Sequence, residues 1–103
     1  MISKKMLLAM NEQIKNEFES AYMYLSMAAY FADQGLDGLA KWMRCQTQEE
    51  MVHAMKLYNH VLERGGTVTL LDIKQLKTRW KSPQEVWDEH TPMSSSLLVK
   101  STT

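Results

Sequence analysis

The sequence predicts an all-α protein with two long antiparallel helices, a long crossover and a short third helix. Three observations predict this fold. Apolar residues recur every three or four positions through residues 3–32 and again through 37–64, which is the period of an amphipathic helix. A glycine-containing segment directly follows each of these two runs. Residues 67–81 then lose the helical period and contain many β-branched side chains, which favours a long extended crossover.

The composition is that of a single globular unit. The 103 residues include 12 basic and 12 acidic side chains and are 45% hydrophobic. Because these charges balance and no run of Lys and Arg occurs, we expect neither a nucleic-acid partner nor an anionic membrane. The N-terminal segment is interrupted by Asn11, Glu12 and Lys15, so it lacks the roughly 7–15-residue apolar stretch of a signal peptide.

Cys45 is the only cysteine in the sequence, which excludes an internal disulfide and fits a reducing compartment. Together with the N-terminal segment, it predicts a cytoplasmic protein. A single cysteine of this kind is most often a small buried apolar side chain, and we expect Cys45 to pack in the core.

The first long helix is predicted over residues 3–32. Asp33 and Gly35 end it, and Asp37 is positioned to cap the helix that follows. A stripe of apolar residues defines its core-facing side: Leu7, Met10, Ile14, Ala21, Leu25, Ala28 and Ala32.

The second long helix is predicted over residues 37–64, where Gly65 and Gly66 stop it. Its apolar stripe contains Leu39, Met43, Leu57 and Val61.

A third helix is predicted to begin after Ser82 and to cover residues 83–91. Ser82 is the expected N-cap, Pro83 suits the first helical position, and Glu85 completes a capping box. Pro92 ends this helix, and residues 92–103 form a tail rich in Ser and Thr.

Both long helices carry ionisable residues inside their apolar stripes. Glu17 interrupts the stripe of the first helix, and Glu50 with His53 interrupts that of the second. The last two are three residues apart and therefore share one helix face. Antiparallel packing brings the middles of the two helices to the same height. Because a buried carboxylate without a partner costs several kcal/mol, a hydrogen-bonded network or a bound cation is expected at this point.

Carboxylates combined with an imidazole suit iron, manganese or zinc, and helical Glu with Glu-x-x-His is the pattern of carboxylate-bridged di-iron bundles. In such a site Glu50 bridges two metal ions, while Glu17 and His53 each complete the shell of one. Tyr24, two turns from Glu17, is placed to donate a hydrogen bond there. The expected reaction is the oxidation of ferrous iron.

Each of these signals also has a simpler interpretation. A lone Glu-x-x-His occurs often by chance in helices. Glu49 lies at the edge of the stripe, so solvation explains it as well as contact with iron does. His60 is expected at the surface, and His90 in a frayed third helix. The joint placement of the three site residues on facing stripes is what favours a metal.

Three segments of the sequence resemble the prokaryotic non-haem ferritins: "NEQIKNEFESAYMYLSMAAYF" of the first helix, which follows Met10 where those proteins carry Leu, "GLAKWMRCQTQEEMVHAMKLYNHVLERGG" of the second, and "SPQEVWDEH" of the third. The resemblance covers residues 1 to about 91. It implies that Glu17, Glu50 and His53 are ferroxidase ligands, that Tyr24 is their neighbour, and that Glu49 lies near an accessory iron position. It also implies a four-helix subunit and a hollow multi-subunit cage that stores a ferric mineral.

The sequence departs from these ferritins after residue 91. They continue the third helix with a His-Glu pair whose Glu is a further iron ligand, whereas this chain has Met93 and Ser94. We therefore divide it into a partial ferritin-like di-iron domain, residues 1–91, and a tail outside the family pattern, residues 92–103. We hypothesise a one-base frame shift near codon 91 or 92, because ordinary codons for the tail, read in a shifted frame, encode His-Glu and an amphipathic continuation. The gene sequence tests this hypothesis.

Three functions are compatible with the residues. The favoured one is an iron-oxidising and iron-storing ferritin, whose partners are ferrous iron, dioxygen or peroxide, and further copies of the chain. The second is a rubrerythrin-like or bacterioferritin-like di-iron protein, although rubrerythrins add a cysteine pair that this sequence lacks. The third is a non-catalytic helical hairpin that dimerises through its exposed stripe, or an inactive ferritin fragment.

Overall fold

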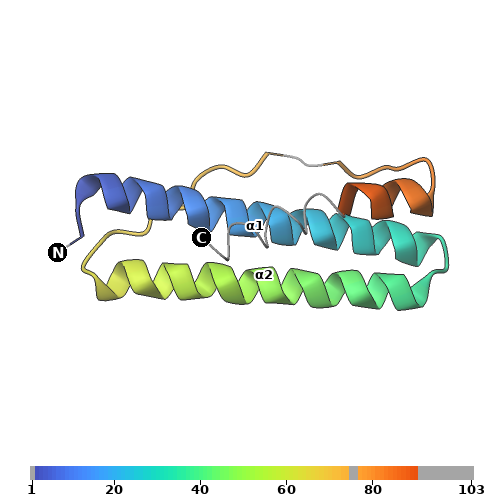
Figure 1. The fold of residues 1–103 in the computed structure, drawn as a ribbon, viewed down its shortest axis with the longest axis horizontal. Coiled ribbons are helices and arrows are strands. Elements are labelled where there is room, and N and C mark those ends of the chain that lie inside the picture. Colours follow the sequence, from blue (N-terminus) through green and yellow to red (C-terminus); the bar gives the residue numbers. More distant parts are fainter. Residues whose placement is uncertain (1, 75–76, 91–103) are drawn as a thin grey trace.

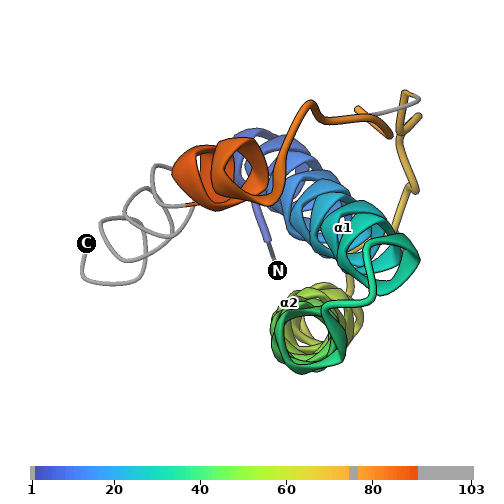
Figure 2. The same ribbon diagram turned by 90° about the vertical axis from the view of Figure 1, so that its right-hand side faces the viewer.

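A computed structural model describes residues 2–74 and 77–90 of the chain. Helix α1 (Lys4–Asp33) and helix α2 (Asp37–Glu63) run antiparallel along each other, and a third, short helix covers residues 83–90 (Figure 1). Seen end-on, the three helices lie at the corners of a triangle, and the crossover starts on the far side of α1 and passes across α1 to reach the 83–90 helix (Figure 2). None of the helices in the described residues is both long and apolar enough to cross a membrane.

These elements confirm the predicted all-α fold with its long antiparallel pair. Both long helices end within one residue of the predicted bounds, and the third begins at residue 83 as expected. Residue 91, the tail at 92–103 and the hypothesised frame shift lie outside the described residues, so the domain boundary at residue 91 stays a prediction.

Local sequence accounts for the ends of the helices. The Ser3 hydroxyl accepts a hydrogen bond from the Met6 N–H at 3.1 Å and caps α1. Gly35 follows α1 with φ of +75°, a left-handed conformation that glycine adopts without steric cost. The expectation that Asp37 caps α2 was wrong, because Leu36 occupies the cap and Asp37 is the first helical residue. There its negative charge still interacts favourably with the helix dipole.

A cluster of buried side chains joins both long helices to the crossover and the 83–90 helix. Its members are Tyr24, Met27, Ala28, Phe31, Ala40, Met43, Trp80 and Val86. Four residues predicted to lie in the core are exposed instead: Ala32, Leu39, Cys45 and Leu25, the last of which is 47% exposed. Because successive helical residues are rotated by about 100°, Leu25 points away from buried Tyr24, and Cys45 points away from buried Met43.

The crossover is extended, as predicted, and is pinned to α1 at two points. The buried Asn11 side chain donates to the Thr67 carbonyl at 3.1 Å and accepts from the Thr69 N–H at 3.0 Å. Two turns before the end of α1, the Ser26 hydroxyl donates to the Lys77 carbonyl at 2.8 Å. These bonds hold the crossover beside α1, although its described residues, 67–74 and 77–81, form no helix.

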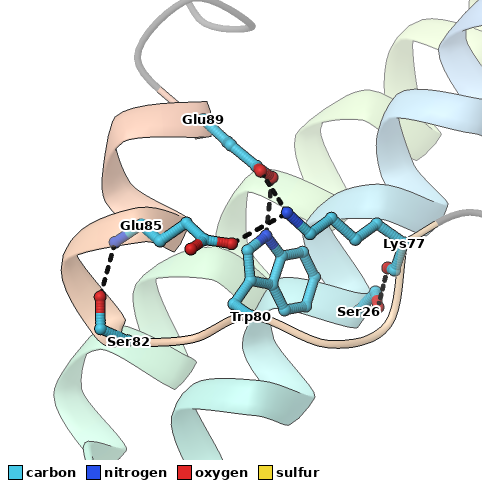
Figure 3. Close-up of polar contacts among 6 residues, drawn as sticks. All are labelled: Ser26, Lys77, Trp80, Ser82, Glu85 and Glu89. Atoms are coloured by element: carbon cyan, nitrogen blue, oxygen red, sulfur yellow. Dashed lines mark hydrogen bonds and ion pairs between the residues drawn. The ribbon is translucent and has the colours of Figure 1, made fainter.

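A polar network fixes the 83–90 helix to the end of the crossover (Figure 3). The Ser82 hydroxyl accepts from the Glu85 N–H at 3.3 Å, which confirms the predicted N-cap. The reciprocal half of the capping box was wrong, because the Glu85 carboxylate instead accepts from Lys77 at 3.0 Å. Lys77 also donates to Glu89, and this hydrogen bond lowers the Glu89 pKa. The Trp80 indole N–H adds a bond to Glu89 at 2.6 Å.

Candidate metal centre

The three residues predicted to bind metal lie together between the long helices. Glu17 comes from α1, and Glu50 and His53 come from α2. One potential ligand atom from each lies within 4.8 Å of the other two. The His53 Nδ1 atom is 3.8 Å from Glu17 Oε2 and 3.9 Å from Glu50 Oε2. These two separations from His53 Nδ1 are short enough for a cation that lies about 2.0–2.2 Å from each donor atom.

The two carboxylates are buried, whereas the imidazole faces solvent. Glu17 is 8% exposed and Glu50 5% exposed, but the side chain of His53 is 55% exposed. The expectation that His53 lies inside the apolar stripe was therefore wrong, and it lies at the edge of the stripe. This arrangement leaves the site open on the histidine side and enclosed on the carboxylate side.

The carboxylate of Glu17 is held in place at only one of its oxygens. Oε1 accepts a hydrogen bond from the Gln13 side chain at 2.8 Å, while Oε2 is buried and accepts none. A buried carboxylate oxygen without a donor is costly unless a cation satisfies it. Two oxygen donors and one imidazole nitrogen form a set that iron, manganese and zinc accept. The chemistry of these residues thus fits the predicted metal.

Tyr24 is buried, with 1% of its surface exposed, on the same face of α1 as Glu17. Burial, and then the negative charges of Glu50 and Glu49, raise the pKa of Tyr24 to about 12. Its phenol therefore keeps its proton at neutral pH and remains a hydrogen-bond donor. Glu49 itself is exposed, at the predicted edge of the stripe.

Other site predictions had mixed outcomes. His60 is exposed as expected. His90 was expected in a frayed helix but is 4% exposed and packed against aromatic rings. Gln13 was not among the predicted site residues, although it lies four residues before Glu17, the spacing at which helical side chains meet.

An antiparallel helix pair with two carboxylates and a histidine converging at its middle defines a class of helical-bundle proteins with carboxylate-rich metal centres. The sequence profile of the family Ferritin, described as a ferritin-like domain, matches residues 7–91 of this chain. The chain belongs to the ferritin family, which confirms the predicted membership.

Individual relatives agree with this assignment. The chain is 42% identical over 101 residues to the bacterial non-heme ferritin of Bacteroides fragilis, covering 95% of this chain and 64% of that protein. It is 36% identical over 89 residues to the bacterial non-heme ferritin of Staphylococcus epidermidis, with coverage of 86% and 54%. The chain thus spans less than two thirds of the length of these relatives.

Solved ferritins have the same fold over the matched region. An engineered closed form of the Archaeoglobus fulgidus ferritin superposes with a TM-score of 0.83 at 48% identity, covering 86% of this chain and 54% of that one. The Chlorobium tepidum ferritin superposes with a TM-score of 0.81 at 34% identity, with coverage of 86% and 55%.

Proposed function

We propose that this protein binds and oxidises ferrous iron at Glu17, Glu50 and His53 and takes part in storing the ferric product. The observation that carries the proposal is the convergence of three metal-binding side chains, with ligand atoms within 4.8 Å of one another, in an otherwise apolar helix interface. Membership of the ferritin family supports iron as the metal, because the relatives named above are ferritins.

Each residue has a role that follows from its position. Glu50 is the most deeply buried carboxylate, at 5% exposed, and is the bridging ligand. Glu17 binds from the opposite helix, where Gln13 fixes its other oxygen. His53 binds from the solvent side and lies where iron enters. Anionic oxygen ligands stabilise the ferric state more than the ferrous state, so they favour oxidation.

The overall reaction takes two electrons from two ferrous ions and passes them to dioxygen, which takes up two protons to give hydrogen peroxide. The three residues fill only part of the coordination shells of two ions. Water or a further copy of the chain supplies the remaining ligands. Tyr24 stays protonated, so its phenol would be available to donate a hydrogen bond at the site.

Self-association is part of the proposal. An apolar groove of about 440 Å³ between α1, α2 and the crossover is lined by residues that include Phe18, Tyr22, Leu25, Met51 and Ile73. Three of these, Tyr22, Leu25 and Met51, are at least 40% exposed. Packing against a second copy would bury this surface, in keeping with the expected assembly into a cage. A cytoplasmic location is the corresponding expectation from the sequence.

The test is aerobic oxidation of ferrous iron by the purified chain, followed through ferric absorbance and oxygen consumption. Glu17→Ala and His53→Ala each remove a ligand and are expected to slow oxidation at least about tenfold. Glu12→Gln is the matched control, because it removes an exposed carboxylate from the same helix. Equal rates in all four proteins would refute the site. Absence of metal binding in the parent chain would favour the non-catalytic hairpin.

A further inference from the structure

A buried histidine joins the three helices at the end of the molecule that carries the turn between α1 and α2. His90, in the 83–90 helix, is 4% exposed. Its ring centroid lies 4.8 Å from that of Trp42 on α2, 5.3 Å from Trp87 on its own helix, and 5.5 Å from Tyr24 on α1. Every helix of the described fold thus contributes an aromatic ring to the surroundings of this imidazole.

These surroundings suit a neutral imidazole and not a cation. The Nδ1 atom of His90 is buried and has no hydrogen-bond partner. A protonated imidazole carries an N–H on both nitrogens, so protonation would bury a positive charge together with an unsatisfied donor. The tryptophan faces attract a cation, but they do not replace a hydrogen-bond acceptor. Burial accordingly lowers the pKa of His90.

No ionised neighbour compensates for this cost among the described residues. From α1 the imidazole faces Tyr24, whose raised pKa of about 12 keeps it neutral in acid. From α2 it faces Trp42, and from its own helix Trp87, neither of which ionises. The carboxylates of Glu49 and Glu50 act on Tyr24, whereas desolvation is the only cause of the shift at His90.

We propose that protonation of His90 in mild acid detaches the 83–90 helix from α1 and α2 and uncovers Tyr24. The proposal concerns the metal-free fold and does not depend on iron oxidation. The detached state is favoured in acid because there the imidazole reaches water and accepts the proton freely.

The direction and range of the effect follow from linkage. His90 has its ordinary pKa of 6.5 when the helix is detached and a lower one when it is docked. Docking is therefore strongest above this value and weakens as the pH falls below it, by up to about tenfold in the docking equilibrium per pH unit. The weakening ends once the pH passes the lowered pKa of the docked state.

The polar network at the other side of the 83–90 helix responds in a different pH range. Lys77 donates to Glu89 and Glu85, and Trp80 donates to Glu89 (Figure 3). The hydrogen bond from Lys77 lowers the pKa of Glu89 below its ordinary value of 4.5. Lys77 and Glu89 therefore keep their charges above about pH 5, so a transition that begins near pH 6.5 can be distinguished from a loss of this network.

The test records the indole NMR signals of Trp42 and Trp87 in the metal-free full-length chain between about pH 8 and pH 5, with far-UV circular dichroism in parallel. In the parent chain both signals are expected to shift together below about pH 6.5 while α1 and α2 stay helical. His90→Phe keeps an aromatic ring without a proton site, so its signals are expected to stay constant. His60→Gln is the matched control at an exposed histidine and is expected to retain the transition.

Several outcomes would overturn the proposal. One is the same transition in His90→Phe, and another is loss of the α1 and α2 helices in the same pH range. If His90→Phe does not fold, the test is the imidazole NMR signal of His90 in the parent chain. This signal must shift over the same pH range as the two indole signals, and a shift in a different range would refute the proposal. Glu89→Gln should weaken docking at every pH but keep the transition. Disappearance of the transition in Glu89→Gln would assign it to the polar network instead.

Discussion

Replacing Glu17 by Gln is expected to stabilise the metal-free protein while removing its response to metal. Glu17 and Glu50 place buried carboxylate oxygens within 4.8 Å of each other. Two like charges at this separation repel by about 3.5 kcal/mol at an effective dielectric constant near 20. Water that enters past the exposed His53 screens part of this repulsion, so we expect the substitution to add about 1–2 kcal/mol to the free energy of unfolding.

Because glutamine has nearly the same shape as glutamate, this substitution removes the negative charge and changes little else. Its amide oxygen can still accept the 2.8 Å hydrogen bond from Gln13, and its amide group can donate to Glu50. The expected rise in melting temperature is about 4–8 °C for each kcal/mol in a domain of this size. Zinc at about one hundred times its dissociation constant should stabilise the parent by about 2.7 kcal/mol and the variant far less.

The assay is thermal unfolding followed by circular dichroism, with and without zinc, at about pH 8, where an ordinary histidine is neutral. Glu12→Gln serves as the control, since its side chain is 55% exposed and its loss should change stability by less than about 0.5 kcal/mol. A metal-free Glu17→Gln protein that melts below both parent and control would refute the repulsion argument. A variant that keeps the full zinc effect would refute Glu17 as a ligand.

Two further predictions follow from buried polar side chains. Asn11→Ala should lower the free energy of unfolding, measured in urea, by about 1–2 kcal/mol, because the Thr67 carbonyl and the Thr69 N–H lose their partner. It should also speed proteolysis of the crossover. Asn16→Ala, the control at a residue without such bonds, should have neither effect. One of the four tyrosines should form phenolate only near pH 12 in an ultraviolet titration, and Tyr24→Phe should abolish that step. Since the folded pKa of Tyr24 is raised, its contribution to stability is present below about pH 10 and is lost as the pH rises toward 12.

The helix bounds could be predicted from sequence because local residues determine them. Gly35 and Gly65 adopt φ of +75° and +76°, a conformation that costs other residues free energy, so their positions fix the ends of α1 and α2. Ser82 similarly caps the 83–90 helix through its own side chain. None of these signals requires knowledge of what the helix packs against.

The depth of each side chain could not be predicted in the same way. A helical period identifies a face, but the partner helix decides where the centre of that face lies. Tyr24 and Met43 lie at this centre, whereas Leu25 and Cys45 do not. The site shows the same limit, because the i, i+3 spacing places Glu50 and His53 on one face but leaves one buried and the other exposed.

The burial of His90 could not be predicted from the sequence for a related reason. The crossover has no helical period, so nothing in it predicts where along α1 the next helix begins. Tertiary contacts fix this position: the bonds from Asn11 and Ser26 to the crossover backbone, and the burial of Val86. Only with these in place does His90 meet Trp42, and a residue expected at a frayed end becomes one of the most buried ionisable groups.

The placement of Glu17 and Glu50 couples folding to metal binding. A buried aliphatic side chain at each of these two positions would add about 1.5–3 kcal/mol to the free energy of unfolding. With carboxylates there instead, this stabilisation is absent from a chain that has a small core. For the two positions together, the missing stabilisation is a large fraction of the free energy of unfolding of a typical domain, which is about 5–15 kcal/mol. A cation between the carboxylates recovers free energy on binding, because it satisfies Glu17 Oε2 and removes the repulsion. Under the proposed function, iron is therefore expected to act both as a substrate and as a ligand that holds α1 against α2.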